Sequence, residues 1–153
     1  MRLLHTTKLQ LVEFQNQDIL PSAIPPYAIL SHTWAEEEVS FQDVQQGLAQ
    51  SQRGYERVAG ACALAVQDGF EYLWIDTCCI DKASSAELSE AINSMFRWYR
   101  DAEVRYAFLS DVDAEENPYS EASSFCKARW FTRRYATKVG QAMPISRQTY
   151  LKQ

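Results

Sequence analysis

The chain has 153 residues, which suits one domain, and 46% of them are hydrophobic, enough to build a buried core. Its formal net charge of −5 argues against a general nucleic-acid-binding protein, because contacts to phosphates need a basic surface. The N-terminus turns polar at once and no apolar run approaches the roughly 20 residues of a membrane span, so we expect a soluble, cytoplasmic protein without a membrane partner.

Cysteine and histidine spacing speaks against a metal site. The four cysteines are Cys62, Cys78, Cys79 and Cys126. They form no Cys-x-x-Cys pair, and neither histidine stands at the spacing of a zinc ligand. Only Lys82 lies close enough in sequence to lower the pKa of a thiol, so we predict free, buried and unreactive cysteines in a reducing compartment.

The first 26 residues are predicted to form a hairpin and a loop. Residues 2–14 hold two short apolar stretches separated by polar residues, which is the pattern of a small β-hairpin. Three prolines between positions 21 and 26 then indicate a loop. We therefore treat 1–26 as an N-terminal segment that precedes a domain over 27–134.

Strands and helices alternate along the next part of the chain. Short continuous apolar runs predict buried strands over 27–31, 72–76 and 104–109. Helix signals fall between them: a short helix capped by Ser40, a helix from about 54 to 68 and a helix from about 84 to 102. This order is typical of an α/β fold with a mainly parallel sheet and flanking helices.

Polar clusters follow the first two of these strands. Ser31, His32 and Trp34 come after the first strand, and Asp76 and Asp81 come after the second. Ligands of such sheets bind beyond the carboxyl ends of the strands, so we predict that the two clusters line one ligand-binding site.

Each residue of these clusters also has a structural interpretation. Ser31 would donate a hydrogen bond to a ligand, whereas a Ser31–His32 nucleophile and base pair is disfavoured, because neighbours in a strand point to opposite faces. Trp34 would stack on a flat ligand, although a tryptophan is more often packed. Turn stabilisation is favoured for Asp81. For Asp76, turn stabilisation and ligand binding are equally favoured.

The third helix carries two acids near its start. Its apolar face is predicted to centre near Leu88, Ile92 and Met95 and to include Ala91, Tyr99 and Ala102. At 100° per residue, Glu87 lies about 100° from that centre and Glu90 about 160° from it, toward solvent. Glu87 is therefore the better candidate for chemistry at the strand ends.

Glu87 could cap the start of the helix instead of acting in catalysis. Ser84 to Glu87 match the S-x-x-E capping box, in which the Glu87 carboxylate would accept a hydrogen bond from the Ser84 backbone N–H. From the residues alone, capping ranks ahead of catalysis.

Two long motifs resemble the fungal heterokaryon incompatibility (HET) domain family. Residues 27–34, Tyr-Ala-Ile-Leu-Ser-His-Thr-Trp, are similar to its opening motif, and 74–82, Trp-Ile-Asp-Thr-Cys-Cys-Ile-Asp-Lys, to its second. Glu87, Met95 and the run Tyr-Arg-Asp-Ala at 99–102 resemble the helix that follows. The order of the motifs matches the family as well.

Only the start of the third motif of that family is present in this chain. Residues 129–133, Arg-Trp-Phe-Thr-Arg, resemble its start, but the usual continuation Gly-Trp-Thr-Leu-Gln-Glu-Leu is absent after Arg133, and Ala35 stands where the first motif usually has glycine. We therefore expect a truncated domain whose sheet is incomplete at the C-terminus. The remaining residues, 135–153, are expected to form a divergent and poorly ordered tail.

The resemblance implies a flavodoxin-like fold, similar to that of Toll/interleukin-1 receptor (TIR) domains, and a role in self/non-self recognition and programmed cell death. Many TIR domains cleave the glycosidic bond of NAD with the help of a glutamate, and by resemblance that role falls to Glu87, with Ser31, Trp34 and Asp76 shaping the pocket. NAD would then be a substrate rather than a cofactor. Partners would be further copies of the chain or other incompatibility proteins. A non-catalytic interaction module and a non-functional fragment remain the alternatives.

Overall fold

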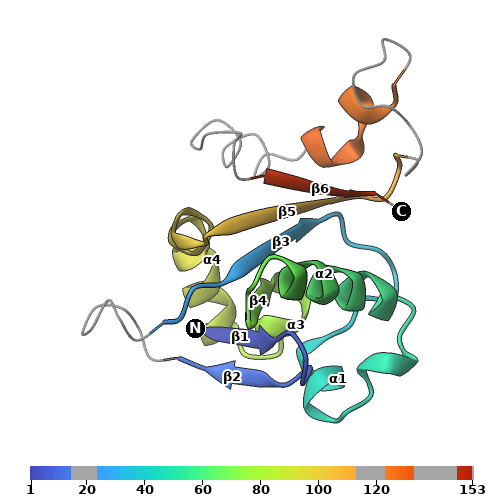
Figure 1. The fold of residues 1–153 in the computed structure, drawn as a ribbon. Coiled ribbons are helices and arrows are strands. Elements are labelled where there is room, and N and C mark those ends of the chain that lie inside the picture. Colours follow the sequence, from blue (N-terminus) through green and yellow to red (C-terminus); the bar gives the residue numbers. More distant parts are fainter. Residues whose placement is uncertain (15–23, 113–122, 133–147, 153) are drawn as a thin grey trace.

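A six-stranded sheet forms the centre of the computed structural model, which describes residues 1–14, 24–112, 123–132 and 148–152. The strand order is β2-β1-β4-β3-β5-β6 (Figure 1). The strands are β1 (Arg2–His5), β2 (Leu11–Glu13), β3 (Ala28–His32), β4 (Tyr72–Ile75), β5 (Val104–Leu109) and β6 (Gln148–Lys152). The helices are α1 (Phe41–Gln45), α2 (Tyr55–Gln67), α3 (Asp76–Cys79) and α4 (Ser85–Asp101), with short 3₁₀ helices at Ala49–Ser51, Phe125–Lys127 and Arg129–Thr132.

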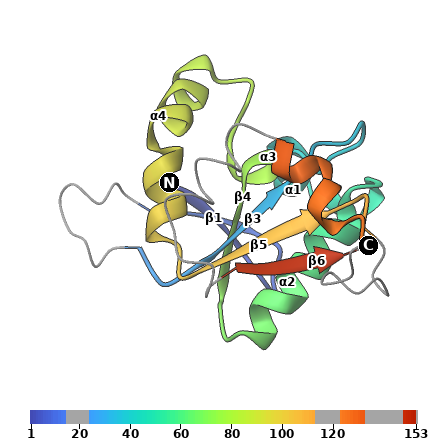
Figure 2. The same cartoon turned by 90° about the horizontal axis from the view of Figure 1, so that it is seen from above.

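The α/β class is confirmed, and the sheet is mixed. β3 pairs in parallel with β4 and β5, and β5 with β6, while β1 is antiparallel to both β2 and β4. Figure 2 shows α2 and α4 on opposite faces of this sheet. Each parallel connection between β3, β4 and β5 therefore crosses over through a helix, as the alternation of strands and helices predicted.

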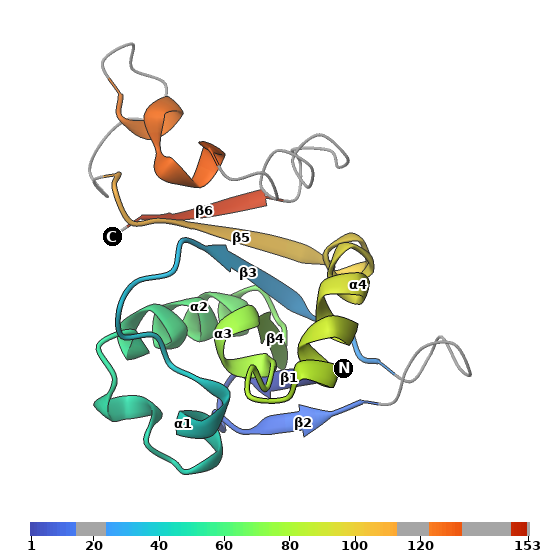
Figure 3. The same ribbon diagram turned by 180° about the vertical axis from the view of Figure 1, so that it is seen from behind.

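The predicted hairpin is confirmed, and it extends the central sheet. Arg2 pairs with Glu13 within the hairpin, and Leu4 pairs with Leu73 of β4. The pairing with β4 brings the first residues of the chain beside the first turn of α4, as Figure 3 shows from behind. The boundary at residue 26 stays a prediction.

The C-terminal strand differs from our expectation for the tail. Residues 148–152 form β6, which pairs with β5 from Arg105 to Leu109, whereas we predicted poor order over 135–153. Backbone hydrogen bonds to an exposed strand edge do not require a strong apolar pattern, which explains why sequence periodicity gave no sign of it. The rest of that tail lies outside the described residues.

Two serine caps fix where the helices begin. Ser40 accepts a hydrogen bond from the Asp43 N–H, and the Asp43 carboxylate accepts one from the Ser40 N–H, so α1 starts with a complete capping box. Ser84 likewise accepts from the Glu87 N–H at the start of α4. Both starts agree with the predicted ones.

The buried face of α4 is rotated relative to our prediction. Ala91 and Tyr99 are buried as predicted, whereas Ile92 is 52% exposed and Trp98, which we did not place on this face, is buried. The reason is that Trp74 of β4 packs against Trp98 and Tyr99, with ring centroids 5.5 and 5.9 Å apart. This rotation leaves Glu87 only about 40° from the buried face centred on Ala91, closer than we predicted.

Within the described part of the chain, no helix is both long enough and apolar enough to cross a membrane.

Candidate functional site

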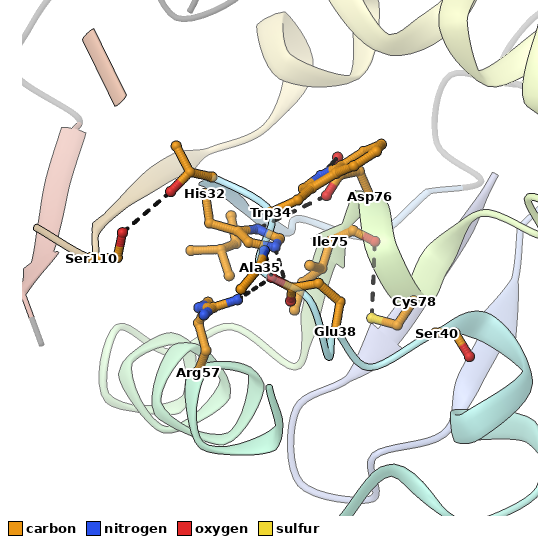
Figure 4. A network of polar contacts seen from close by, with 12 residues as sticks. His32, Trp34, Ala35, Glu38, Ser40, Arg57, Ile75, Asp76, Cys78 and Ser110 are labelled. Atoms are coloured by element: carbon orange, nitrogen blue, oxygen red, sulfur yellow. Dashed lines mark hydrogen bonds and ion pairs between the residues drawn. The ribbon is translucent and has the colours of Figure 1, made fainter. Parts of the chain in front are cut away.

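A buried histidine links the carboxyl ends of β3 and β4. His32, the last residue of β3, is 2% exposed. Its Nε2 lies 3.3 Å from Glu38 Oε2, and its Nδ1 lies 3.9 Å from Asp76 Oδ1 (Figure 4). The imidazole thus lies behind the surface and between two carboxylates, where it positions them rather than contacting a ligand directly.

Glu38 is the most strongly perturbed acid of this cluster. Burial would raise its pKa, but hydrogen bonds with His32 and from the Ala35 N–H, together with the charges of His32 and Arg57, outweigh burial and lower the pKa to about 2. Arg57 of α2 forms an ion pair with the same carboxylate. The sequence analysis missed both residues, because nothing in the run Glu36-Glu37-Glu38 separates the buried acid from its exposed neighbours.

Trp34 and Asp76 join the two predicted polar clusters directly. The indole Nε1 of Trp34 donates to Asp76 Oδ2 at 2.8 Å, and the ammonium of Lys82 lies 3.8 Å from the centre of the indole ring. Trp34 is nevertheless 56% exposed, and its stacking on a flat ligand stays a prediction. Asp76 begins the helical turn α3, which we did not predict and which follows β4 directly.

Ser31 lies apart from the other candidates. Its Oγ accepts a hydrogen bond from Trp130 Nε1 at 3.0 Å. Strand alternation turns it away from His32, as we expected, and the tryptophan of the third motif covers it. The structure therefore does not bring Ser31 together with Trp34 and Asp76.

Glu87 has a different set of partners from the predicted capping box. Its carboxylate accepts a hydrogen bond from the Asp81 N–H at 2.8 Å and forms an ion pair with Arg2 of β1, while the Ser84 N–H donates to the Asp81 carbonyl. The predicted bond from Ser84 N–H to Glu87 is wrong, because the loop after α3 offers its own amide to the carboxylate. Only the serine half of the box forms.

Asp81 has the turn-stabilising role that we favoured. Its Oδ1 accepts from the Ala83 N–H at 3.0 Å and from Gln42 Nε2 at 2.8 Å. The Asp81 backbone N–H donates to the Glu87 carboxylate, so the loop between α3 and α4 connects the second motif to the candidate acid.

A cavity of about 620 Å³ adjoins Glu87. The hairpin contributes Arg2 and Phe14 to its wall, and the start of α4 contributes Glu87 and Glu90. This volume lies within the range of about 300–1,000 Å³ that small-molecule sites occupy. The Glu87 side chain lines this cavity and is 26% exposed.

Three of the four thiols are buried, as predicted, and the side chain of Cys126 lies outside the described residues. Cys62, Cys78 and Cys79 are free and buried. Burial raises the pKa of Cys62 to about 12, and the hydrogen bond with Cys79, together with burial, raises that of Cys78 well above the usual range. Among the described residues, no group of three or more side chains that bind metals could hold an ion.

Gly54 fits a close approach between two segments of the site. A Cβ at this position would lie 2.8 Å from the Glu37 carbonyl oxygen, whereas a Cβ at Gly60, in the middle of α2, would meet nothing within 4 Å. We expect Gly54→Ala to lower the free energy of unfolding by about 1–3 kcal/mol, because the 35–38 loop must shift.

The matched substitution Gly60→Ala should instead raise the free energy of unfolding by up to about 1 kcal/mol, since alanine is the better helix former. Urea denaturation followed by circular dichroism measures both. Equal effects of the two substitutions would contradict the close packing at Gly54.

Comparisons with known proteins agree with the motifs. The family model described as "Heterokaryon incompatibility protein (HET)" matches residues 27–151, a range that ends within β6. The vegetative incompatibility protein HET-E-1 of Podospora anserina is 52% identical over 124 residues, which cover 76% of this chain and 9% of that relative. The chain thus spans less than a tenth of the relative's length. No solved structure matches the chain.

Proposed function

The chain belongs to the heterokaryon incompatibility (HET) family, and from that premise we propose that it acts in fungal self/non-self recognition and promotes cell death by hydrolysing NAD. The observation that supports this most is the Glu87 carboxylate, which lines a cavity of ligand size beside the guanidinium of Arg2. The free, buried cysteines of the described residues favour the cytoplasm as the place of action.

The proposal includes a flavodoxin-like fold of the TIR type. The four parallel strands lie side by side in the order β4, β3, β5, β6. If they are numbered 1 to 4 along the chain, starting at β3, this spatial order is 2-1-3-4. Flavodoxin-like sheets have the order 2-1-3-4-5, so the described strands agree with its first four members. The antiparallel hairpin on the β4 side is an addition to that arrangement.

The proposed reaction breaks one bond and forms another. The bond between C1′ of the ribose and the nicotinamide nitrogen breaks, and its electron pair stays on nicotinamide, which leaves neutral. A water oxygen then bonds to C1′ and loses a proton to solvent. The ribose gains oxocarbenium character in the transition state, and a fixed negative charge at Glu87 lowers its energy, both directly and by accepting hydrogen bonds from ribose hydroxyls.

Arg2 would hold Glu87 until the substrate enters. The guanidinium stacks 4.4 Å from the centre of the Phe41 ring, which fixes its plane. Its Nη1 is buried without a hydrogen-bond partner among the described residues, so it has a donor to offer to a phosphate oxygen of the substrate. Movement of the guanidinium toward that phosphate would release one carboxylate oxygen for the ribose.

The test is nicotinamide release from NAD by the purified chain, measured by chromatography. We expect Glu87→Gln to reduce the rate by about 10²–10³-fold, because it removes the charge while its amide oxygen still accepts from the Asp81 N–H. Glu90→Gln is the matched control: it alters an acid of the same helix in the same cavity wall and should keep the activity.

Two results would contradict the proposal. One is a folded wild-type chain that releases no nicotinamide, and the other is equal loss in both variants. Circular dichroism and a thermal unfolding transition of each variant establish that it is folded.

A non-catalytic association module is the second candidate. Ile92 and Phe96, one turn apart on α4, are 52% and 50% exposed, and such apolar pairs are common at helix contacts between proteins. Self-association in analytical ultracentrifugation together with absent nicotinamide release would favour this second candidate.

A further inference from the structure

A second cleft lies between the carboxyl ends of β3 and β5. It has a volume of about 520 Å³, and Thr33 and Trp34 after β3 and Ser110 after β5 contribute to its wall. The hydroxyls of Thr33 and Ser110, which both line the cleft, lie 3.4 Å apart. None of the residues that line this cleft lines the cavity beside Glu87.

The topology of the sheet marks this cleft as a ligand site. After β3 the next strand along the chain, β4, lies on one side of β3 in the sheet. The later strands β5 and β6 lie on the opposite side of β3. The order of the strands therefore reverses between β3 and β5. In open α/β sheets the crevice at such a reversal is where ligands bind, because the two diverging connections leave a space above the strand ends.

Three arginines from separate elements line the cleft. Arg53 precedes α2, Arg57 lies in its first turn, and Arg129 belongs to the last 3₁₀ helix. Arg53 and Arg129 are 85% and 72% exposed, and each lies 3.5 Å from one carboxylate, Arg53 from Glu37 and Arg129 from Asp111. Such exposed ion pairs contribute little to stability, so an anion that binds several guanidinium donors at once can compete with the carboxylates for both arginines.

The N-terminus of α2 belongs to the same wall. Gly54 lines the cleft as the N-cap of this 13-residue helix, and no side chain caps the N-terminus. The Gly54 and Tyr55 N–H groups already donate to the Glu37 and Gln52 carbonyls, and Glu56 lies in the first turn, so this end of the helix adds its dipole to the cleft rather than free donors. Glu36 and Glu37 also line the cleft, and Glu37 lies on its exposed rim beside Arg53.

An aromatic surface lies beside these arginines. Trp34 is 56% exposed and lines the cleft, while its Nε1 is held by Asp76. Because Lys82 lies over one face of the indole, the other face is the platform on which a flat heterocycle would stack. Phosphate donors and a base platform in one crevice fit a nucleotide better than a bare anion.

We propose that this switch-point cleft binds a nucleotide, whose phosphates contact Arg53 and Arg129 and whose base stacks on Trp34. The site lies apart from Glu87, so binding here requires no hydrolysis of NAD. The same cleft could hold a regulatory nucleotide or one end of a larger dinucleotide, and both share this chemistry.

Isothermal titration of the full chain at low salt tests the proposal with three probes: inorganic pyrophosphate, ADP and adenosine. We expect ADP to bind more tightly than pyrophosphate, and adenosine to bind weakest. The double variant Arg53→Gln/Arg129→Gln should weaken ADP roughly tenfold or more, because two charge-assisted contacts are lost. Higher salt should weaken ADP binding to the wild type.

Arg100→Gln is the control for the loss of charge, since Arg100 is exposed on α4, pairs with Asp101 and does not line the cleft. It should leave ADP affinity within about twofold of the wild type, because a charge outside the cleft is screened by the buffer. Trp34→Leu should remove the advantage of ADP over pyrophosphate.

The proposal is overturned if neither ADP nor pyrophosphate binds the folded wild type, if Arg100→Gln weakens ADP as much as the double variant does, or if Trp34→Leu leaves the preference for ADP intact. Because these readouts measure binding alone, they are independent of whether Glu87 supports nicotinamide release.

Discussion

Replacing Trp74 with alanine should lower the free energy of unfolding by about 3–5 kcal/mol, a large part of the stability of a domain of this size. Trp74 is completely buried in β4 and packs on Trp98 and Tyr99 of α4. Its loss leaves a cavity between the sheet and the helix that carries Glu87. Urea denaturation followed by far-ultraviolet circular dichroism measures the change.

Trp34→Ala is the matched control, since it removes a tryptophan that is 56% exposed. We expect a loss of only about 1 kcal/mol, mainly from its hydrogen bond to Asp76. A wild-type chain that unfolds without a cooperative transition would contradict a packed core around Trp74. It would favour the interpretation as a non-functional fragment, for which compact states with loose packing are expected.

The second large effect is a loss of stability in acid that depends on Glu38. Its pKa in the folded chain is lowered to about 2, so the carboxylate stabilises the fold above its unfolded pKa of about 4.3 and loses this contribution as the pH falls toward 2. At pH 7 the contribution amounts to about 3 kcal/mol at most. Glu38→Gln should remove it, because the amide carries no charge for His32 and Arg57.

The difference in unfolding free energy between the wild type and Glu38→Gln should shrink to about half between pH 7 and pH 3. Chemical denaturation at each pH gives both values. Glu36→Gln, which replaces an exposed acid two residues away, should show only a small and nearly constant difference from the wild type. A difference for Glu38→Gln that does not change with pH would refute the assigned charge interactions of Glu38.

Local sequence signals predicted most of the elements. The serine caps at Ser40 and Ser84 and the apolar runs of β3, β4 and β5 act over a few residues, and each is present in the structure as expected. α3 was missed because four residues are too short for a periodic pattern. The rotation of α4 was missed because the identity of its buried face depends on Trp74, which lies in another element.

The candidate site was only partly accessible to sequence reasoning. The strand rule brought Trp34 and Asp76 together correctly, and their side chains are hydrogen-bonded. Glu38, Arg57 and Arg2 were not found, because they reach the site from a loop, a helix and a hairpin strand whose positions depend on tertiary packing. The switch-point cleft was missed for the same reason, as it requires the order of the strands rather than their existence.

The sequence by itself determined the alternation of strands and helices, the caps and the family motifs, because these depend on neighbours along the chain or on the match of whole segments. Only the tertiary structure decided which partner each polar group takes. Glu87 was available to the Ser84 amide by sequence, but the loop after α3 and Arg2 of β1 bind its carboxylate. A carboxylate pairs with the donors that folding brings nearest, and two of those donors come from parts of the chain that local patterns cannot connect.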